Sequence, residues 1–350
     1  MKRILLVKMS SLGDIVHALA GVNDAAGHGY RFDWVAEPAF AEIPALHPAV
    51  DNVIPLPWRK WRRNLSQHRG DFANFVRDLR QREYDLIIDS QGLIKSAAVA
   101  RIAAGPGKTP VAGFNFTSAR EPWAAFSYAR RCAVPWRQHA IDRQRALFAA
   151  ALNYPLPDSE FAFHPQASAQ AGAEDPVPDK AVMLFHGTTW PSKHWPDQMW
   201  EGLIQIALEQ GYTPLVAWAS EDEHRRAQRF GQVGATVLPR MDIGRLIQVV
   251  VRCRAVISID SGLGHLGASL GVPTLGLYGP TDALLTGTIG PRVHHLQGQA
   301  PCMPCMRREC DRYTGPAQDW QGQPVVPACF AAVPPDRVWQ AVRELMAEKS

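Results

Sequence analysis

Hydrophobic and polar positions along this chain repeat one arrangement: a short apolar run, a turn of small or polar residues, then a segment with helical spacing. The apolar runs are rich in β-branched residues and lack strict alternation, as expected of strands that helices cover on both faces. In the first half they predict strands at 4–7, 31–36, 53–56, 84–89 and 111–114. Helices are expected from residue 15 and at 71–83 and 139–151.

The second half repeats this arrangement after a stretch at 155–180 that is rich in Pro and Ala and has little periodicity. That stretch is interpreted as one short strand at 160–163 followed by a linker. Strands are predicted at 181–185, 214–218, 236–238, 255–259 and 274–278, and helices at 198–210, 243–252 and 263–270. We therefore expect an α/β protein with two doubly wound domains, 1–165 and 178–333, and a last helix at 334–350 of a kind that can cross back to the first domain.

The run Asp260-Ser261-Gly262-Leu263-Gly264-His265 directly follows a predicted buried strand. Ligands of open α/β sheets bind at the carboxyl ends of the strands, and the free N–H groups of a helix N-terminus form an anion site. The pattern favours a ligand that carries phosphate. A plain glycine-rich turn with a capping aspartate is the alternative.

A second such turn, Lys8-Met9-Ser10-Ser11-Leu12-Gly13-Asp14, follows the first strand. Gly13 suits close approach of the backbone to another group. Asp14 has two interpretations, a helix N-cap and a general base at a ligand site. No G-x-G-x-x-G sequence occurs at either turn, so a nicotinamide or flavin dinucleotide fold is not supported.

Length and composition describe a globular protein of more than one domain: 350 residues, 46% hydrophobic and 20% charged, with net charge +4. A chain of this length exceeds one ordinary core. No segment is long and apolar enough to cross a bilayer, and the N-terminus reads as a strand and not as a signal peptide. We expect a cytoplasmic protein. With a pI near 8.8 and no recognisable nucleic-acid-binding motif, nucleic acid is not an expected partner.

Basic residues gather in a dense run at 58–63 that alternates with Trp58 and Trp61. A solvated surface turn is one interpretation; a binding surface for a polyanion with sugar or apolar parts is the other. Further basic residues, Lys95 and Arg120, come just after strand ends.

Four cysteines lie in the loop 300–330: Cys302, Cys305, Cys310 and Cys329. Two of them form a C-x-x-C pair, and four thiolates can hold a structural zinc or iron ion. Disulfides, or four reduced thiols, are the alternatives. A metal held by four thiolates would crosslink the loop and would have no open coordination position for catalysis.

Several of these stretches together resemble the lipopolysaccharide heptosyltransferases of glycosyltransferase family 9. They are Ser10 to Asp14, Gln91-Gly-Leu-Ile-Lys95, Thr117-Ser-Ala-Arg-Glu-Pro122, Lys193-His-Trp-Pro196, Asp260 to His265, and Tyr278-Gly-Pro-Thr-Asp282. The resemblance covers roughly residues 1–296. It implies the GT-B fold, with two Rossmann-like domains facing a central cleft, the acceptor on the first domain and the sugar nucleotide on the second.

The resemblance implies transfer of L-glycero-D-manno-heptose from ADP-heptose to the inner 3-deoxy-manno-octulosonic acid (Kdo) of Kdo2-lipid A, with inversion and without a catalytic metal or other required cofactor. Transient contact with the inner leaflet of the inner membrane follows, because the acceptor is a lipid. The alternatives are heptosyltransferase II or another family 9 enzyme, a GT-B nucleotide-sugar 2-epimerase, and a sugar-nucleotide or lipopolysaccharide binding protein without activity.

The resemblance also implies roles for individual residues. Asp14 would be the base, and Lys193 would meet the leaving ADP. The expected donor-binding residues are Thr188, Thr189, Glu223, Met241, Asp260, Ser261, Gly262, Leu263 and His265. The expected acceptor-binding residues are Ser10, Gly13, Arg59, Lys60, Arg62, Arg63, Lys95 and Arg120. Three have structural alternatives: Lys193 as a solvated lysine, Glu223 as an acid of a first helical turn, and His265 as a structural histidine.

Overall fold

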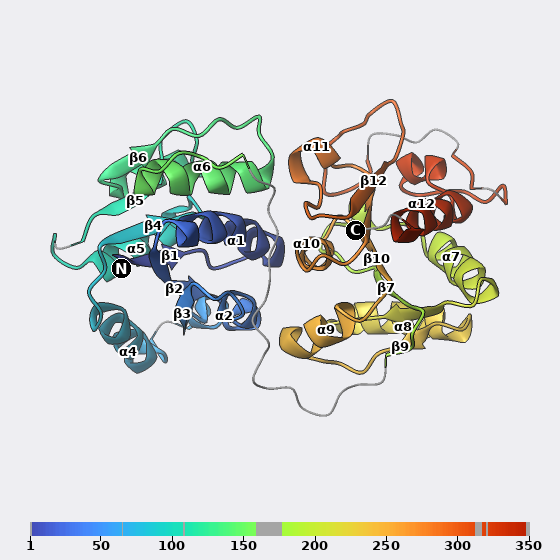
Figure 1. Ribbon diagram of the computed structural model, residues 1–350, viewed down its shortest axis with the longest axis horizontal. Coiled ribbons are helices and arrows are strands. Elements are labelled where there is room, and N and C mark those ends of the chain that lie inside the picture. The colour runs from blue at the N-terminus through green and yellow to red at the C-terminus, as the bar shows by residue number, and fades with distance from the viewer. Residues whose placement is uncertain are drawn as a thin grey trace. The chain divides into compact units, whose positions relative to one another are not determined.

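Two six-stranded parallel sheets organise the computed structural model (Figure 1). The structure describes residues 2–64, 66–107, 109–158, 177–311, 317–319 and 321–347. The chain divides into two units, Met1–Ser168 and Ala169–Ser350. The strand expected at 160–163 lies outside the described residues.

The sheet of the first unit has the strand order β3-β2-β1-β4-β5-β6, and every pairing is parallel. Its strands are β1 (Lys2–Val7), β2 (Tyr30–Ala36), β3 (Val50–Pro55), β4 (Leu86–Asp89), β5 (Val111–Phe114) and β6 (Arg130–Cys132). The order reverses between β1 and β4. Their carboxyl ends therefore flank the position where open α/β sheets bind ligands.

Helices cover both faces of this sheet. On one face α1 (Leu12–Gly27) packs on α6 (Ala140–Leu152), and Phe148 of α6 lies 5.9 Å from Phe32 of β2 between ring centroids. The opposite face holds a core of β1, α4 and α5 residues. The remaining helical segments are η1 (Pro38–Phe40), α2 (Glu42–Ala45), α3 (Trp58–Trp61), α4 (Arg69–Arg80), α5 (Ile94–Ala104) and η2 (Pro122–Ser127).

The second unit repeats the design with the order β12-β11-β10-β7-β8-β9. Its strands are β7 (Ala181–Phe185), β8 (Thr213–Val216), β9 (Thr236–Val237), β10 (Ala255–Ile259), β11 (Thr274–Tyr278) and β12 (Val293–Gln297). All pairs are parallel, and here the order reverses between β7 and β10. This confirms the expected α/β class with two doubly wound sheets.

Alternate residues of β7 point to opposite faces, although all of them are buried. Val182 and Leu184 pack with α7 (Asp197–Glu209), α8 (Glu221–Gln232) and α12 (Pro335–Ala347). Met183 and Phe185 pack with α9 (Ile243–Val250) and α10 (Gly262–Ser269). The period of two explains why a strand buried on both faces is continuously apolar. The short segments η3 (Pro191–Lys193), α11 (Ala283–Thr286) and η4 (Ala328–Ala332) complete the unit.

The last helix, α12, belongs to the second unit. Val338 and Val342 are fully buried there, and the helix packs against α7 and β11. Its apolar face therefore packs on elements of its own unit, and the crossing to the first domain stays a prediction.

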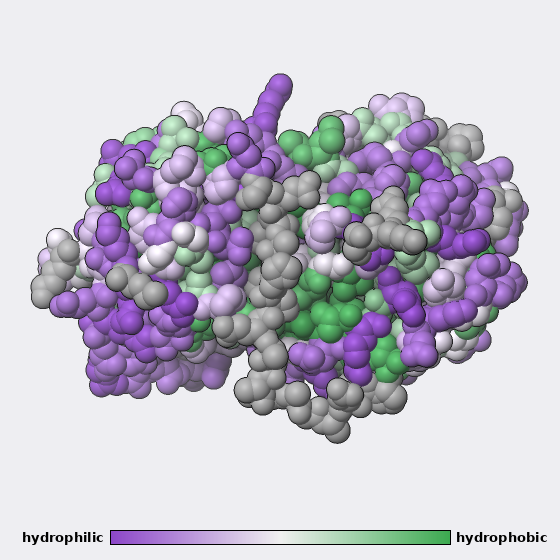
Figure 2. Space-filling view, in the orientation of Figure 1, coloured by the Kyte–Doolittle hydropathy of each residue, from purple (hydrophilic) through white to green (hydrophobic). Residues whose placement is uncertain are grey.

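Among the elements that were not expected from the sequence are two edge strands and one short helix. The edge strands β6 and β12 are rich in Arg and His and carry too little apolar signal to be recognised. The basic run at 58–63 contains α3, and its Trp61 is 4% exposed within the core. By contrast, the surface over the neighbouring α4 is strongly hydrophilic (Figure 2).

Candidate active site

The turns that the sequence singled out follow β1 and β4 in the first unit, and β7 and β10 in the second. Because all strands within a sheet run parallel to one another, the carboxyl ends of each pair of strands lie at one edge of their sheet. Each pair also flanks the reversal of strand order. Within each unit, the candidate residues therefore gather at the expected ligand-binding edge.

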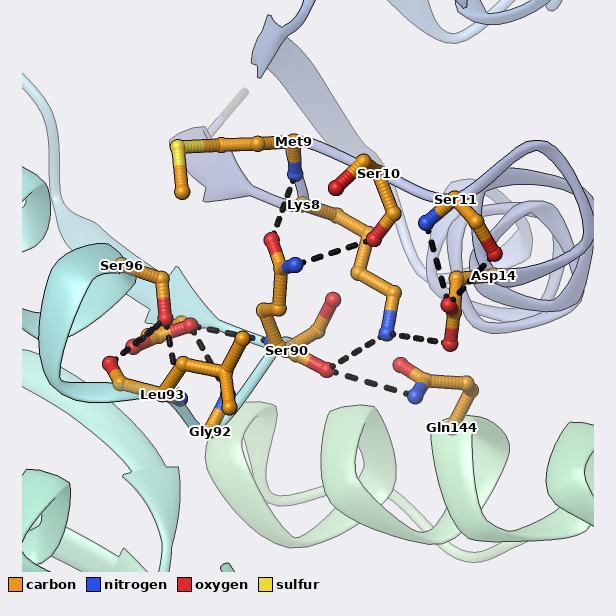
Figure 3. A network of polar contacts seen from close by, with 12 residues as sticks. Lys8, Met9, Ser10, Ser11, Asp14, Ser90, Gly92, Leu93, Ser96 and Gln144 are labelled. Atoms are coloured by element: carbon orange, nitrogen blue, oxygen red, sulfur yellow. Dashed lines mark hydrogen bonds and ion pairs between the residues drawn. The ribbon is translucent and has the colours of Figure 1, made fainter. Parts of the chain in front are cut away.

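Asp14 lies in the first turn of α1 and is held from two sides (Figure 3). Its Oδ2 accepts hydrogen bonds from the backbone N–H of Ser11 at 3.0 Å and from the Ser11 hydroxyl at 2.9 Å. Its Oδ1 lies 3.3 Å from Nζ of Lys8. Ser11, and not Asp14, is the N-cap. The Asp14 side chain keeps 40% exposure, and each carboxylate oxygen has further lone pairs for an incoming hydroxyl.

Lys8 is a buried cation that the sequence analysis overlooked. Its side chain is 4% exposed, and its Nζ also donates to the backbone oxygen of Ser90 at 3.1 Å, after β4. That oxygen accepts a further bond from Gln144 of α6 at 3.3 Å (Figure 3). A lysine at the end of a buried strand, six residues before an aspartate, was the available signal.

The surroundings of Asp14 favour its ionised form. Burial opposes ionisation, but the charges of Lys8 and His17 and the hydrogen bonds from Ser11 outweigh it, so the pKa of Asp14 lies well below its usual range. Such a carboxylate is charged at neutral pH. It is a weak base, and it takes a proton readily only from a hydroxyl made acidic by bond formation.

The turn after β4 holds the turn after β1 in place. The Gln91 side chain accepts from the Met9 N–H at 2.8 Å and donates to the Ser10 carbonyl at 3.0 Å. Asp89, fully buried, accepts from the N–H groups of Gln91 and Gly92 and from the hydroxyls of Ser96 and Tyr128. Burial raises the pKa of Asp89, and these four donors counteract that rise. Gln91 and Asp89 are therefore positioning residues.

The expected acceptor-binding residues divide by their surroundings. Ser10 is buried and Gly13 half-buried at the turn after β1. Arg59 pairs with the buried Glu37 at 2.9 Å and lies over the Phe40 ring. The remaining basic side chains form no ion pair with any residue the structure describes: Lys60, Arg62, Arg63, Lys95 and Arg120. All are exposed except Lys95, which is half-buried. Because Trp61 packs edge-on against Phe72 and Phe75, it supplies no stacking surface for a ligand.

Lys193 and Asp260 meet in the second unit, although 67 positions separate them in the chain. Their Nζ and Oδ2 atoms are 2.7 Å apart, and the side chains are 17% and 7% exposed. The same Oδ2 accepts from the Thr281 hydroxyl at 2.7 Å, and Lys193 lies over the Trp190 ring at 4.7 Å. Lys193 is thus not a solvated surface lysine. The sequence analysis did not single out Trp190 or Thr281.

The first turn of α10 follows Asp260 directly. Ser261 is its N-cap and accepts from the Gly264 N–H at 3.4 Å, while the N–H groups before it have no partner within the helix. A Cβ on Gly264 would come within 2.6 Å of the Ser258 hydroxyl, so only glycine lets α10 approach β10 this closely. His265 is 4% exposed inside the helix. Gly262 and Leu263 are half-buried beside it.

Glu223 has the capping role that was its structural alternative. Its carboxylate accepts from the N–H groups of Ala219 at 2.7 Å and Ser220 at 3.2 Å. It also lines, with Thr188, an open pocket of about 610 Å³ whose walls include His194 and Arg226. The capping role is therefore confirmed, and the ligand-binding role stays a prediction.

Met241 and Thr189 have other surroundings than Thr188 and Glu223, which line the open pocket. Met241 and Leu263 are both half-buried against the core under α9. Thr189 is exposed, and its carbonyl accepts from Arg308. Neither Thr189 nor Met241 lines the open pocket.

All four cysteines of the loop 300–330 line one cavity of about 20 Å³. Burial, with the nearby thiols of the other three, raises the pKa of Cys329 to about 12. All four are free thiols, with Cys310 exposed and Cys329 buried. Across the described residues, no three Cys, His, Asp or Glu side chains are arranged to hold a metal ion. The expected structural zinc or iron is therefore not supported, and reduced thiols are the arrangement observed.

Comparisons with known proteins show similarity to one glycosyltransferase family. A model of glycosyltransferase family 9 (heptosyltransferase) matches residues 72–314. The lipopolysaccharide heptosyltransferase 1 of Pseudomonas aeruginosa is 44% identical over 345 residues, which cover 96% of each chain. The solved E. coli heptosyltransferase WaaC with ADP is 32% identical, with a TM-score of 0.81 over 98% of this chain and 99% of that one. WaaC with ADP-2-deoxy-2-fluoro heptose is 31% identical, with a TM-score of 0.77 over the same shares.

Proposed function

This chain belongs to glycosyltransferase family 9 and is a heptosyltransferase of lipopolysaccharide core biosynthesis with the GT-B fold, and from this premise we propose its acceptor, its stereochemistry and the roles of its residues. The proposed reaction moves L-glycero-D-manno-heptose from ADP-heptose to the inner Kdo of Kdo2-lipid A. It inverts C1 of the heptose and uses no catalytic metal. Acceptor and base belong to residues 1–165, and the donor binds within 178–333.

The observation that carries this proposal is the meeting of Lys193 with Asp260 beside the N-terminus of α10. The diphosphate of a sugar nucleotide needs cations and N–H donors, increasingly so as the leaving ADP gains charge. Lys193 is proposed to provide the cation, and the N–H groups of Gly262 and Leu263 the donors. Asp260, held by Thr281, is proposed to accept from the heptose hydroxyls.

The remaining donor contacts follow from the same turns of the second unit. Ser261 and His265 are proposed to complete the diphosphate site, with Thr188 and Thr189 as hydroxyl donors. Glu223 is assigned to the ribose hydroxyls and Met241 to the adenine. The open pocket beside Thr188 and Glu223 supports the first of these two assignments.

Asp14 is proposed to take the proton of the attacking Kdo hydroxyl. The oxygen of that hydroxyl bonds to C1 of the heptose while the bond from C1 to the ADP oxygen breaks, and the proton passes to the Asp14 carboxylate. This charged carboxylate suits a late proton transfer, because the hydroxyl becomes acidic only as its bond to C1 forms.

The acceptor carries Kdo carboxylates and lipid A phosphates, for which guanidinium groups are good partners. The exposed Arg62, Arg63 and Arg120 form no ion pair with other described residues, and they are proposed to bind these anions. Arg59, Lys60 and Lys95 are proposed to add positive charge, while Ser10 and Gly13 line the turn near the acceptor hydroxyl.

No helix in the described residues combines the length and the apolarity needed to cross a bilayer. The proposed acceptor is a membrane lipid, so we place the enzyme at the cytoplasmic face of the inner membrane, in transient contact with it.

The direct test is incubation with ADP-heptose and Kdo2-lipid A, followed by mass spectrometry of the lipid. The expected product is heavier by one heptose, forms equally in the presence of a chelator, and has the anomeric configuration opposite to that of the donor. Turnover only on an acceptor that already carries heptose would reassign the enzyme to another family 9 reaction. Binding of ADP-heptose without product would favour a binding protein.

The role of Asp14 is tested by Asp14→Asn, which keeps the size of the side chain and removes its charge. Transfer should fall by about 10²- to 10⁴-fold, the usual contribution of a general base, while ADP-heptose affinity in calorimetry stays unchanged. Asp142→Asn, at an exposed aspartate in the first turn of α6, is the matched control. Full activity of Asp14→Asn would exclude the base role.

A further inference from the structure

Besides Leu156, five large apolar side chains lie exposed on the first unit. They are Ile94, Phe116, Trp123, Phe126 and Trp136, with exposures from 37% for Phe116 to 70% for Trp123. Among the residues that the structure describes, every exposed Phe or Trp is one of these five. We refer to them as the aromatic patch.

The aromatic patch is a preformed surface. The ring of Phe126 is stacked with Trp123, their centroids 5.8 Å apart, and meets Phe116 edge-on at 4.9 Å. Trp136 donates from Nε1 to the carbonyl of Thr117, next to Phe116, at 2.6 Å. The Ile94 N–H is bound by the Glu121 side chain at 2.7 Å, which brings Ile94 beside η2.

Positive charge surrounds this apolar surface. Between residues 115 and 137 the chain has four arginines, namely Arg120, Arg130, Arg131 and Arg137, and Glu121 is the single acid. The Arg131 guanidinium lies over the Phe116 ring at 5.2 Å. The same sign holds on a larger scale, because unit Met1–Ser168 has 21 Lys and Arg against 15 Asp and Glu, and unit Ala169–Ser350 has 16 against 18.

The patch also has a defined place in the sheet. Ile94 follows β4, Phe116 follows β5, and Trp136 follows β6. All three strands are parallel to β1, so these residues lie on the edge of the sheet that also carries Asp14. A surface that docks through this patch therefore lies on the same side of the unit as the proposed base.

We propose that the aromatic patch docks on an anionic phospholipid bilayer, with its rings at the level of the headgroups and its arginines on lipid phosphates. Tryptophan and other aromatic side chains favour this interface, where one side is apolar and the other wet. Anionic lipids attract the flanking cations. The inference rests on the proposed function, because a lipid acceptor presents its sugars at that surface.

A second copy of the chain fits the patch less well. A symmetric contact would place the same surface on both partners, and the arginines around one patch would then face those around the other. Like charges at such a contact repel one another, whereas the phosphates of an anionic bilayer neutralise them.

The test is co-sedimentation of the full-length protein with vesicles of phosphatidylcholine, with and without phosphatidylglycerol. The wild type should bind the anionic vesicles and bind the neutral ones weakly. Trp123→Ser combined with Phe126→Ser should lower the partition coefficient by about tenfold or more, because two aromatic side chains no longer leave water. Leu284→Ser, at an 83% exposed apolar residue of the second unit, should bind as the wild type does.

Activity assays separate docking from catalysis. The double variant should transfer heptose at the wild-type rate to a deacylated, water-soluble acceptor, and about tenfold more slowly to the lipid acceptor presented in vesicles. Wild-type vesicle binding by the double variant would overturn the proposal, and so would equal loss of both activities. A third outcome is that the wild type binds vesicles as expected but forms no product on any acceptor. That outcome would refute the proposed function and would still support the docking surface.

Discussion

A buried lysine, Lys8, and a half-buried one, Lys193, pair with the two aspartates of the proposed mechanism. Lys8 lies beside Asp14 and favours its charged form. Lys193 is held by Asp260 and by the Trp190 ring, which keeps a cation in place before any ligand binds. Such preorganisation lowers the cost of stabilising a leaving group, because the cation need not be reoriented as charge develops.

Replacing Lys193 with Met should remove that cation and keep most of its volume. We expect kcat to fall by about 10²- to 10³-fold, as when one preorganised donor is lost, with a smaller effect on the KM for the acceptor. Lys180→Met, at an exposed lysine of the same unit, is the control. Steady-state kinetics with both substrates varied checks this, and an unchanged kcat would show that Lys193 only supports Asp260.

Lys8 determines the acid side of the pH profile in this account. The pKa of Asp14 is lower in the folded than in the unfolded state, so its contribution to stability is present above the ordinary aspartate pKa and is lost as the pH falls through the lowered value. Because the lowered pKa also keeps the Asp14 carboxylate ionised, the wild-type kcat/KM should show no loss of activity from protonation of Asp14 between about pH 8 and pH 5.

In Lys8→Met the strongest attraction on the Asp14 carboxylate is gone while its burial remains, so its pKa rises. The acid limb of kcat/KM should move toward neutral pH, and the unfolding free energy at pH 7 should fall. A pH series of kcat/KM beside a urea melt separates the two effects. An acid limb that stays in place in a folded variant would contradict the coupling of Lys8 to Asp14.

At the scale of the element, the short helix α10 packs closely on the preceding strand β10, because small residues at their contact let the two backbones approach. Gly264 faces Ser258, and a Cβ added to Gly267 would lie 3.0 Å from the Val256 side chain. The helix N-terminus is thereby held at the end of β10, where Asp260 and Lys193 meet. The position of the proposed diphosphate site therefore depends on backbone packing as much as on its polar side chains.

Gly264→Ala should push α10 away from β10, because the new Cβ would lie 2.6 Å from the Ser258 hydroxyl. Overpacking of this kind costs about 1–3 kcal/mol of stability, and ADP affinity should fall with it. Gly70→Ala in α4, with nothing within 4 Å of its Cβ, should keep both stability and affinity. Thermal melts with and without ADP measure both, and wild-type ADP binding by Gly264→Ala would show that the helix position does not matter.

At the scale of the whole molecule, charge is divided between the two units, with the surplus of Lys and Arg in Met1–Ser168. Charged groups at exposed sites attract a polyanion over long distances, and salt screens that attraction. This division agrees with an anionic acceptor for the first unit. The proposed donor site of the second unit relies on partly buried charges, which salt screens less.

The KM for the acceptor should accordingly rise several-fold between about 0.05 and 0.5 M NaCl, and the KM for ADP-heptose should change less. Arg62→Gln and Arg63→Gln should each raise the acceptor KM by about two- to fivefold at low salt, the range for exposed ion pairs, and flatten its salt dependence. Arg343→Gln, exposed in α12, serves as control. Equal salt dependence for both substrates would refute this assignment.

The sequence by itself determined the repeated strand and helix pattern, the two sheets, and the turns that carry Asp14, Lys193 and Asp260. These are local signals, since an apolar run and the turn after it are read within a few residues. The edge strands β6 and β12 were missed because their Arg- and His-rich sequences resemble surface turns.

Only the tertiary structure decided which side chains meet. It paired Lys193 with Asp260 across 67 positions and Lys8 with Asp14, and it buried Trp61. It also gathered Phe116, Trp123 and Phe126 into an exposed patch. The physical reason is that burial and electrostatics depend on distances between segments remote in the chain, and those distances follow from strand order and helix packing.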